Sequence, residues 1–125
     1  MSDGITVLVC GGRDYADQHH VDFVLDALHQ ARDIWHIVEG GALGADRLAR
    51  NWARRNDVRF STYEADWQRH GKAAGPIRNG VMLRMERPAL VVAFPGGAGT
   101  ANMVRQAQAA GVEVYDAGYP TEARP

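Results

Sequence analysis

The sequence predicts an α/β fold: a doubly wound, mostly parallel sheet of five strands with helices on both faces. Two features of the chain predict it. Short runs of aliphatic and β-branched residues alternate with longer amphipathic stretches, which is the order of elements in a parallel sheet covered by helices. Three of these apolar runs lead directly into glycine-rich turns, which marks them as short buried strands.

The first half of the chain supplies three expected strands and two helices. Residues 5–10 (ITVLVC) are an apolar run that ends at a glycine pair, so we expect a buried strand. Asp17 can cap the next helix, in which apolar residues recur at the spacing of one buried face. We expect a second strand at residues 35–38, a second helix at residues 45–56 and a weaker third strand at residues 58–63.

The second half supplies two more strands and two more helices. Residues 64–75 are less regular, and Pro76 can then begin a helix that runs to about residue 86, because the first turn needs no backbone donor from it. Residues 89–94 (ALVVAF) are the clearest buried strand. A helix at residues 99–110, ended by a left-handed glycine, and a last strand at residues 112–115 complete a Rossmann-like sheet.

Composition and charge limit the classes of protein to which the chain can belong. Its 125 residues suit a single domain, which we expect at residues 1–117, with a flexible tail at residues 118–125. The 14 basic and 15 acidic residues give a formal net charge of -1, which argues against a broad basic face for nucleic acid. The sequence has no apolar run near the roughly 18 residues of a membrane helix and no recognisable signal peptide. We therefore expect no membrane partner and a cytoplasmic location.

Cysteine and histidine usage gives no sign of a metal centre. Cys10 is the single cysteine, which excludes an internal disulfide framework and a multi-cysteine zinc site. The five histidines are not spaced as metal ligands with any acid or cysteine. We expect neither a metal site nor a cofactor.

Three glycine-rich turns carry the functional prediction. They span residues 11–14, 40–44 and 95–100, each directly after an expected strand. Because parallel strands bring their carboxyl ends to one edge of the sheet, these turns are expected to meet where ligands bind in such folds. Glycine lets the backbone approach a ligand and present N–H groups, and a helix N-terminus favours an anion. The turns predict the binding of a nucleotide or nucleotide-derived small molecule that carries a phosphate. The alternative is that the glycines of each turn serve only to make a tight connection from strand to helix.

Polar residues near these turns complete the expected site. Arg78 lies at a helix start, where the dipole opposes a cation, so an arginine aimed at a ligand anion is favoured over a solvated one. Asn79 can bind a base or a ribose hydroxyl. Asp46 lies in the first turn of its helix, where the dipole stabilises a carboxylate; the alternative is contact with a ribose or with a partner arginine such as Arg13. The residues expected to bind the ligand are Gly11, Gly12, Arg13, Gly40, Gly41, Gly44, Asp46, Lys72, Arg78, Asn79, Pro95, Gly96, Gly97, Gly99 and Thr100.

Hydrolytic chemistry would need an acid in the cleft. Asp14, Glu39 and Asp46 are the candidate catalytic residues. Glu39 closes the second expected strand, so we expect it to point toward the cleft or into solvent. Trp67 is either a core residue or a platform for a base.

The glycine turns and their flanking residues resemble the SLOG superfamily, and most closely its small YspA/YpsA-related members. The resemblance rests on residues 11–15 (GGRDY), 39–46 (EGGALGAD), 67–79 (WQRHGKAAGPIRN) and 91–100 (VVAFPGGAGT). It implies a Rossmann-like fold and a nucleotide-derived ligand. It also implies a homodimer or higher homo-oligomer. The helix expected at residues 76–86 offers a candidate dimer face made of Val81, Met82, Leu83 and Met85.

The superfamily includes the LOG phosphoribohydrolases, which cut the N-glycosidic bond of a nucleoside monophosphate. Their Pro-Gly-Gly-x-Gly-Thr-x-x-Glu motif is matched by residues 95–100, but Met103 stands at the position of the glutamate. A thioether can neither stabilise an oxocarbenium-like transition state nor position water. The leading interpretation is therefore a binding module, a sensor or carrier. The alternative is a LOG-type phosphoribohydrolase or N-glycosidic transferase in which Asp14, Glu39 or Asp46 replaces the glutamate. Nucleic-acid binding in the manner of DprA is the weakest reading.

Overall fold

Five parallel strands form one sheet in the order β3–β2–β1–β4–β5. The structure is a computed structural model that describes residues 4–118; the tail expected at residues 118–125 lies outside this range except for its first residue. The strands are β1 (Ile5–Cys10), β2 (Ile34–Glu39), β3 (Arg59–Thr62), β4 (Leu90–Ala93) and β5 (Glu113–Asp116). The sequence prediction of a Rossmann-like α/β fold is confirmed, and the sheet is wholly parallel.

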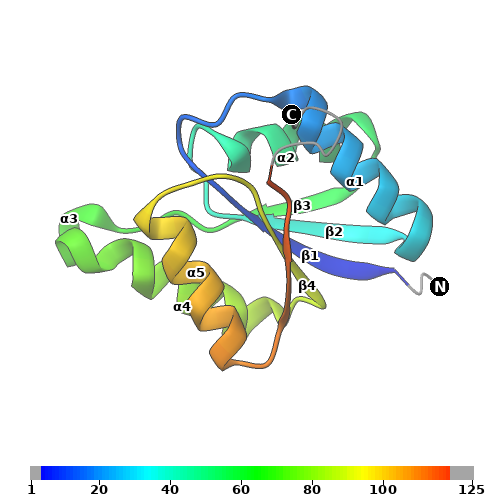
Figure 1. Ribbon diagram of the computed structural model, residues 1–125. Helices are drawn as coiled ribbons and strands as arrows, with labels where there is room; N and C mark the ends of the chain where they lie inside the picture. The colour runs from blue at the N-terminus through cyan, green and yellow to red at the C-terminus, as the bar shows by residue number, and fades with distance from the viewer. Residues whose placement is uncertain (1–3, 119–125) are drawn as a thin grey trace.

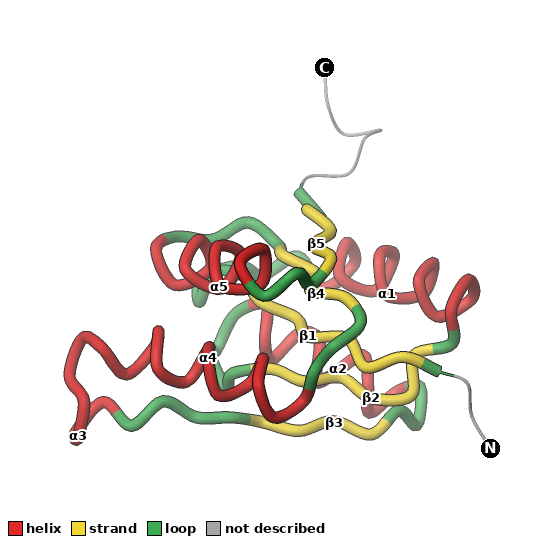
Figure 2. Tube along the Cα trace, turned by 90° about the horizontal axis from the view of Figure 1, so that it is seen from below, coloured by secondary structure: helices red, strands yellow, loops and turns green. Residues whose placement is uncertain are grey.

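Helices cover both faces of this sheet. They are α1 (Gln18–Arg32), α2 (Ala45–Arg55), α3 (Trp67–His70), α4 (Ala74–Glu86) and α5 (Ala98–Ala109), with a 3-10 turn at Gly71–Ala73. Figures 1 and 2 show α1 and α2 on one side and α4 and α5 on the other. Each side buries its own apolar cluster, one containing Trp52 and Phe94 and the other containing Met82 and Met103.

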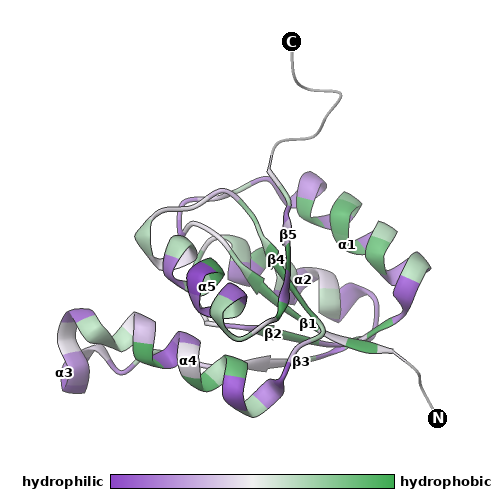
Figure 3. Ribbon diagram, turned by 60° about the horizontal axis from the view of Figure 1, so that its bottom comes forward, coloured by the Kyte–Doolittle hydropathy of each residue, from purple (hydrophilic) through white to green (hydrophobic). Residues whose placement is uncertain are grey.

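The central strand β1 is buried on both faces, which explains its uninterrupted apolar sequence. Val7, Leu8 and Val9 have no exposed surface, and the hydropathy colouring of Figure 3 shows β1 and β4 as apolar strands beneath the helices. The predicted ends of several elements are also found. Asp17 caps α1 by accepting a hydrogen bond from the His20 N–H, and Gly111 follows α5 with a φ of +75°.

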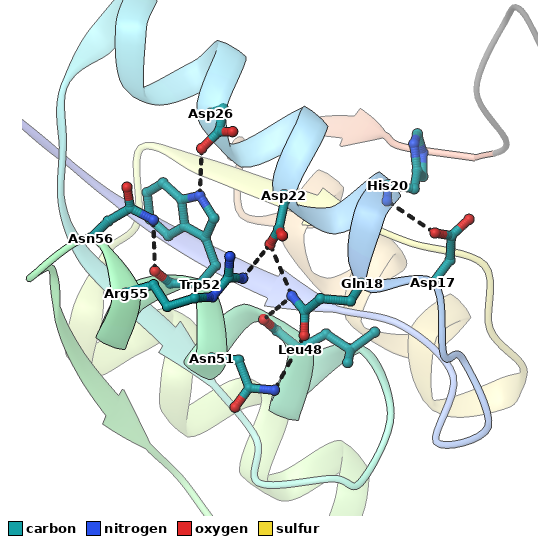
Figure 4. Close-up of polar contacts among 10 residues, drawn as sticks. All are labelled: Asp17, Gln18, His20, Asp22, Asp26, Leu48, Asn51, Trp52, Arg55 and Asn56. Carbon is teal, nitrogen blue, oxygen red and sulfur yellow. Dashed lines mark hydrogen bonds and ion pairs between the residues drawn. The ribbon is translucent and has the colours of Figure 1, made fainter.

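A polar seam joins α1 to α2 and fixes their relative position (Figure 4). The indole Nε1 of Trp52 donates to Asp26 at 2.8 Å, and Arg55 forms an ion pair with Asp22 at 2.6 Å. Gln18 donates to the Leu48 carbonyl oxygen at 3.0 Å. Because α2 begins directly after the second glycine turn, this seam also holds that turn in place.

The structure differs from the sequence prediction around the second half of the chain. The segment expected to be irregular contains α3, which Asp66 caps by accepting from the Arg69 N–H at 3.1 Å. The next helix begins at Ala74, two residues before Pro76. Of the four residues named for a candidate dimer face, Met82 and Leu83 are buried in the core and Met85 is exposed; the dimer itself stays a prediction.

No helix within residues 4–118 is both long enough and apolar enough to cross a membrane.

Candidate functional site

A cavity of about 990 Å³ lies at the carboxyl ends of the strands. The chain runs outward from the central strand β1 to β2 and β3 on one side and to β4 and β5 on the other. Such a reversal of strand order leaves a crevice above the strand ends, which is where ligands bind in open α/β sheets. The three glycine turns all reach this crevice.

Most of the residues expected from the sequence meet at this cavity. The cavity-lining members of that set are Gly11, Gly12, Arg13, Asp14, Gly40, Gly41, Asp46, Lys72, Arg78, Asn79, Pro95, Gly96, Gly97, Gly99 and Thr100. Gly44 and Glu39 belong to the expected set but do not line the cavity. A Cβ on Gly44 would lie 2.6 Å from the backbone carbon of Arg13, so this glycine serves the packing of two loops.

The β4–α5 loop brings exposed residues to the cavity. No side chain caps α5, and its first backbone hydrogen bond runs from the Ala101 N–H to the Gly97 carbonyl oxygen at 3.0 Å. The N–H groups of the first turn therefore have no partner within the helix. A Cβ on Gly97 or Gly99 would meet no atom within 4 Å. These two glycines are exposed and are not required by packing, so a ligand has room to approach the backbone here.

Gly96 in the same loop has a packing role instead. A Cβ at this position would lie 2.6 Å from the backbone nitrogen of Gly12 and 2.9 Å from the carbonyl carbon of Gly11. The Gly12 N–H also donates to the Pro95 carbonyl oxygen at 2.8 Å. The first and third glycine turns are therefore packed backbone against backbone.

The β2–α2 loop uses its N–H groups within the protein. Asp46 accepts from the N–H groups of Gly40 at 3.1 Å and Ala42 at 3.2 Å. Glu39 accepts from the Gly41 N–H at 2.7 Å. The sequence predicted that this turn presents its backbone N–H groups to a phosphate. In the structure, three of these N–H groups already donate to the carboxylates of Asp46 and Glu39.

Glu39 points neither toward the cleft nor into solvent, contrary to the sequence expectation. It has no exposed surface. The Thr62 hydroxyl donates to its second oxygen, and Arg50 lies 3.6 Å from the first. These partners hold Glu39 as a structural carboxylate between β2 and β3, and it does not line the cavity.

Asp46 is a buried carboxyl group at the cavity wall. Only 6% of its surface is exposed. Burial raises the pKa of Asp46 to about 6, with a smaller contribution from the nearby charge of Glu39, and its two backbone hydrogen bonds oppose this rise. The group therefore exchanges a proton near neutral pH, which is the property of a general acid or base.

Arg78 and Asn79 connect the loops rather than extend freely into the cavity. The Arg78 Nη1 donates to the Gly40 carbonyl oxygen at 2.7 Å, and its Nε donates to the side-chain oxygen of Asn79 at 3.0 Å. Asn79 in turn donates to the Gly99 carbonyl oxygen at 3.3 Å and to Asn102 at 3.1 Å. These bonds give the pair a structural role, because they link the β2–α2 loop to the start of α5; the ligand contacts expected of the pair stay a prediction.

Cys10 and Met103 show no reactive arrangement. Cys10 lines the cavity, but burial raises the pKa of its thiol to about 12, so the nucleophilic thiolate is scarce at neutral pH. Met103 is 1% exposed and packs in the core, while its neighbour Asn102 lines the cavity. No group of three or more His, Cys, Asp or Glu that could hold a metal occurs among residues 4–118.

Several residues at the cavity were not expected from the sequence. They are Tyr15, Leu43, Glu64 and Asn102. Glu64 lies two residues after the end of β3, so the rule that ligands lie at the carboxyl ends of strands could have identified it. Trp67 was left open between the core and the site, and the structure gives it an exposed position at the cavity.

Comparison with known proteins agrees with the geometry. A family model described as "YspA, cpYpsA-related SLOG family" matches residues 5–70, from β1 to the end of α3. The chain is also similar to the Gene 61 protein of Mycobacterium phage D29. The two are 39% identical over 120 residues, which cover 90% of this chain and 95% of the relative.

Proposed function

Because the chain belongs to the YspA, cpYpsA-related SLOG family, we propose that its cavity binds a nucleotide or nucleotide-derived small molecule as a sensor or carrier. The observation that carries the proposal is the first turn of α5. Gly97 and Gly99 leave space for an anion, and the N-terminus of a twelve-residue helix favours one. This turn is where the phosphate binds.

Two exposed cations support this assignment. Arg13 and Lys72 line the same cavity, and both are exposed. Their charges attract a phosphate and can close over it, whereas Arg78 is held by backbone carbonyl groups. The carboxylates of Asp14 and Glu64 also line the cavity. They accept hydrogen bonds from the hydroxyl groups of a ribose.

A thermal-shift screen tests the proposal. The ligands are the four common nucleoside monophosphates, NAD, ADP-ribose and ribose 5-phosphate, with ribose as the control that lacks a phosphate. A ligand at 100 times its Kd stabilises a protein by about 2.7 kcal/mol, which corresponds to a Tm shift of roughly 10 °C for a chain of this size. The proposal predicts such a shift for at least one phosphorylated ligand and none for ribose. A screen without any shift would contradict it.

Asp46 favours a second candidate function, cleavage of the N-glycosidic bond. A carboxyl group with a pKa of about 6 can protonate a leaving base at neutral pH. If this chemistry occurs, incubation with a bound nucleoside monophosphate releases the free base. Asp46→Asn abolishes that release and preserves binding, because the amide oxygen still accepts the loop hydrogen bonds. Recovery of an intact ligand from the wild type would leave the sensor or carrier function.

A further inference from the structure

Two large apolar side chains are exposed at the rim of the cavity. Leu43 is 62% exposed and Trp67 is 60% exposed. Both line the cavity at the strand ends, whereas the other exposed large apolar residues of the described chain, such as Phe23 and Met85, do not. Exposed apolar surface at the edge of a binding cavity marks a place that a ligand covers.

Each of these side chains is carried on a well-fixed segment. Leu43 belongs to the β2–α2 loop, which Asp46 and Glu39 hold through three backbone hydrogen bonds. Trp67 is the first residue of α3, which Asp66 caps. A Cβ on Gly75 would lie 3.3 Å from the ring carbon Cη2 of Trp67, so the absence of a side chain there lets the indole lie against the start of α4. The rim is therefore formed before a ligand arrives.

The polar residues around the rim indicate the chemistry of its occupant. The side chain of Glu64 lies over the same loop as Leu43, with its Cγ 3.1 Å from the position of a Cβ on Gly41. Its carboxylate accepts N–H and O–H donors, which an alkyl chain lacks and a nucleobase or sugar carries. A volume of about 990 Å³ is at the upper end of the roughly 300–1,000 Å³ usual for small-molecule pockets. It exceeds what a phosphate alone would occupy.

We infer that Leu43 and Trp67 hold the planar heteroaromatic ring of the ligand, while its phosphate lies at the first turn of α5. The inference rests on the proposed function and specifies the ligand class: a phosphate and a planar ring joined by a hydroxylated linker. Stacking on Trp67 is tolerant of the base, because every base has a π-face. Leu43 supplies apolar contact, and the ring covers the surface that both side chains expose.

Trp67→Ala tests this inference against a matched control, Trp35→Ala. Trp35 is 43% exposed and does not line the cavity; its ring packs under Arg59 at 4.6 Å. The four nucleoside monophosphates and ribose 5-phosphate are titrated into both variants and the wild type by calorimetry. We expect the wild type and Trp35→Ala to bind at least one nucleotide about tenfold or more tightly than ribose 5-phosphate. In Trp67→Ala the ratio falls toward one, and the affinity for ribose 5-phosphate stays at the wild-type value.

Fluorescence gives an independent readout of the same contact. Trp52 is fully buried, so Trp67 is the indole that a ring in the cavity quenches. Quenching by the nucleotide is expected in Trp35→Phe and absent in Trp67→Phe. A Trp67→Ala variant that keeps the nucleotide preference overturns the inference and leaves the proposed function intact. If the wild type binds none of the nucleoside monophosphates, NAD, ADP-ribose or ribose 5-phosphate, the proposed function fails, and the inference fails with it.

Discussion

Replacing Gly99 with alanine separates the stability of the fold from the binding of a phosphate. Gly99 is the second residue of α5, and a Cβ there would meet no atom within 4 Å. Because alanine has less backbone freedom than glycine in the unfolded chain, Gly99→Ala is expected to stabilise the protein by about 0.4–1 kcal/mol. With an unfolding entropy of about 2.1 cal/mol/K per residue, this corresponds to a Tm increase of roughly 1.5–4 °C.

The same methyl group is expected to weaken binding. It stands where a phosphate oxygen would approach the N–H groups of the first turn, and a hydrogen bond to a charged group contributes about 1.5–3 kcal/mol. Loss of one such bond lowers the affinity for ribose 5-phosphate by roughly tenfold or more. Calorimetry measures the affinity, and scanning calorimetry of the free protein measures the Tm.

Two other glycines provide controls of opposite kinds. Gly111 also has open space around it, but its φ is +75°, so Gly111→Ala lowers the Tm and leaves the affinity unchanged. Gly96→Ala brings a methyl group against fixed backbone atoms of Gly12 and Gly11 and lowers the stability substantially. A decrease in Tm for Gly99→Ala, or an unchanged affinity, would refute the reasoning.

Three further substitutions test individual contacts. Because the pKa of Asp46 is raised from 3.8 to about 6, the wild type loses roughly 3 kcal/mol of unfolding free energy as the pH rises from about 4 to above 6. Asp46→Asn is expected to remove that pH dependence, which is measured as the urea midpoint of unfolding at a series of pH values. If the midpoint varied with pH in the same way for the wild type and the variant, the assignment to Asp46 would be wrong. Arg78→Lys cannot span the bonds to Gly40 and Asn79 and costs about 1–3 kcal/mol; Arg47→Lys, at an exposed site, is the near-neutral control. Trp52→Phe removes the hydrogen bond to Asp26 and is expected to lower the free energy of unfolding by about 1–3 kcal/mol, measured by urea denaturation. A decrease in this free energy smaller than the decrease for Arg47→Lys would contradict this expectation.

Local patterns in the sequence were sufficient to predict the architecture of the fold. The apolar run of β1, the capping residue Asp17 and the left-handed Gly111 each depend on neighbours a few residues away. The helical spacing that buries Met103 and Ala107 on one face of α5 is also readable from sequence. The family prediction is confirmed by the family model over residues 5–70, which include the motifs at residues 11–15 and 39–46.

The partners of polar side chains could not be predicted in this way. Glu39 is buried because Thr62 and Arg50 reach it from other elements. Arg78 donates a hydrogen bond to the carbonyl oxygen of Gly40, which lies 38 residues earlier in the chain. Such pairs depend on how the elements pack against one another. The sequence therefore located the glycine turns, but it could not tell in which turn the N–H groups are already bonded to the protein's own side chains.

The most direct test of the account is a titration of the ¹⁵N-labelled protein with ribose 5-phosphate, followed by amide chemical shifts. We predict the largest changes at residues 97–100, whose N–H groups begin α5. Residues 40–42 are predicted to change less, because their N–H groups are bonded to Asp46 and Glu39. The largest changes at residues 40–42, or no changes at residues 97–100 at saturation, would contradict the assignment of the phosphate to the β4–α5 loop.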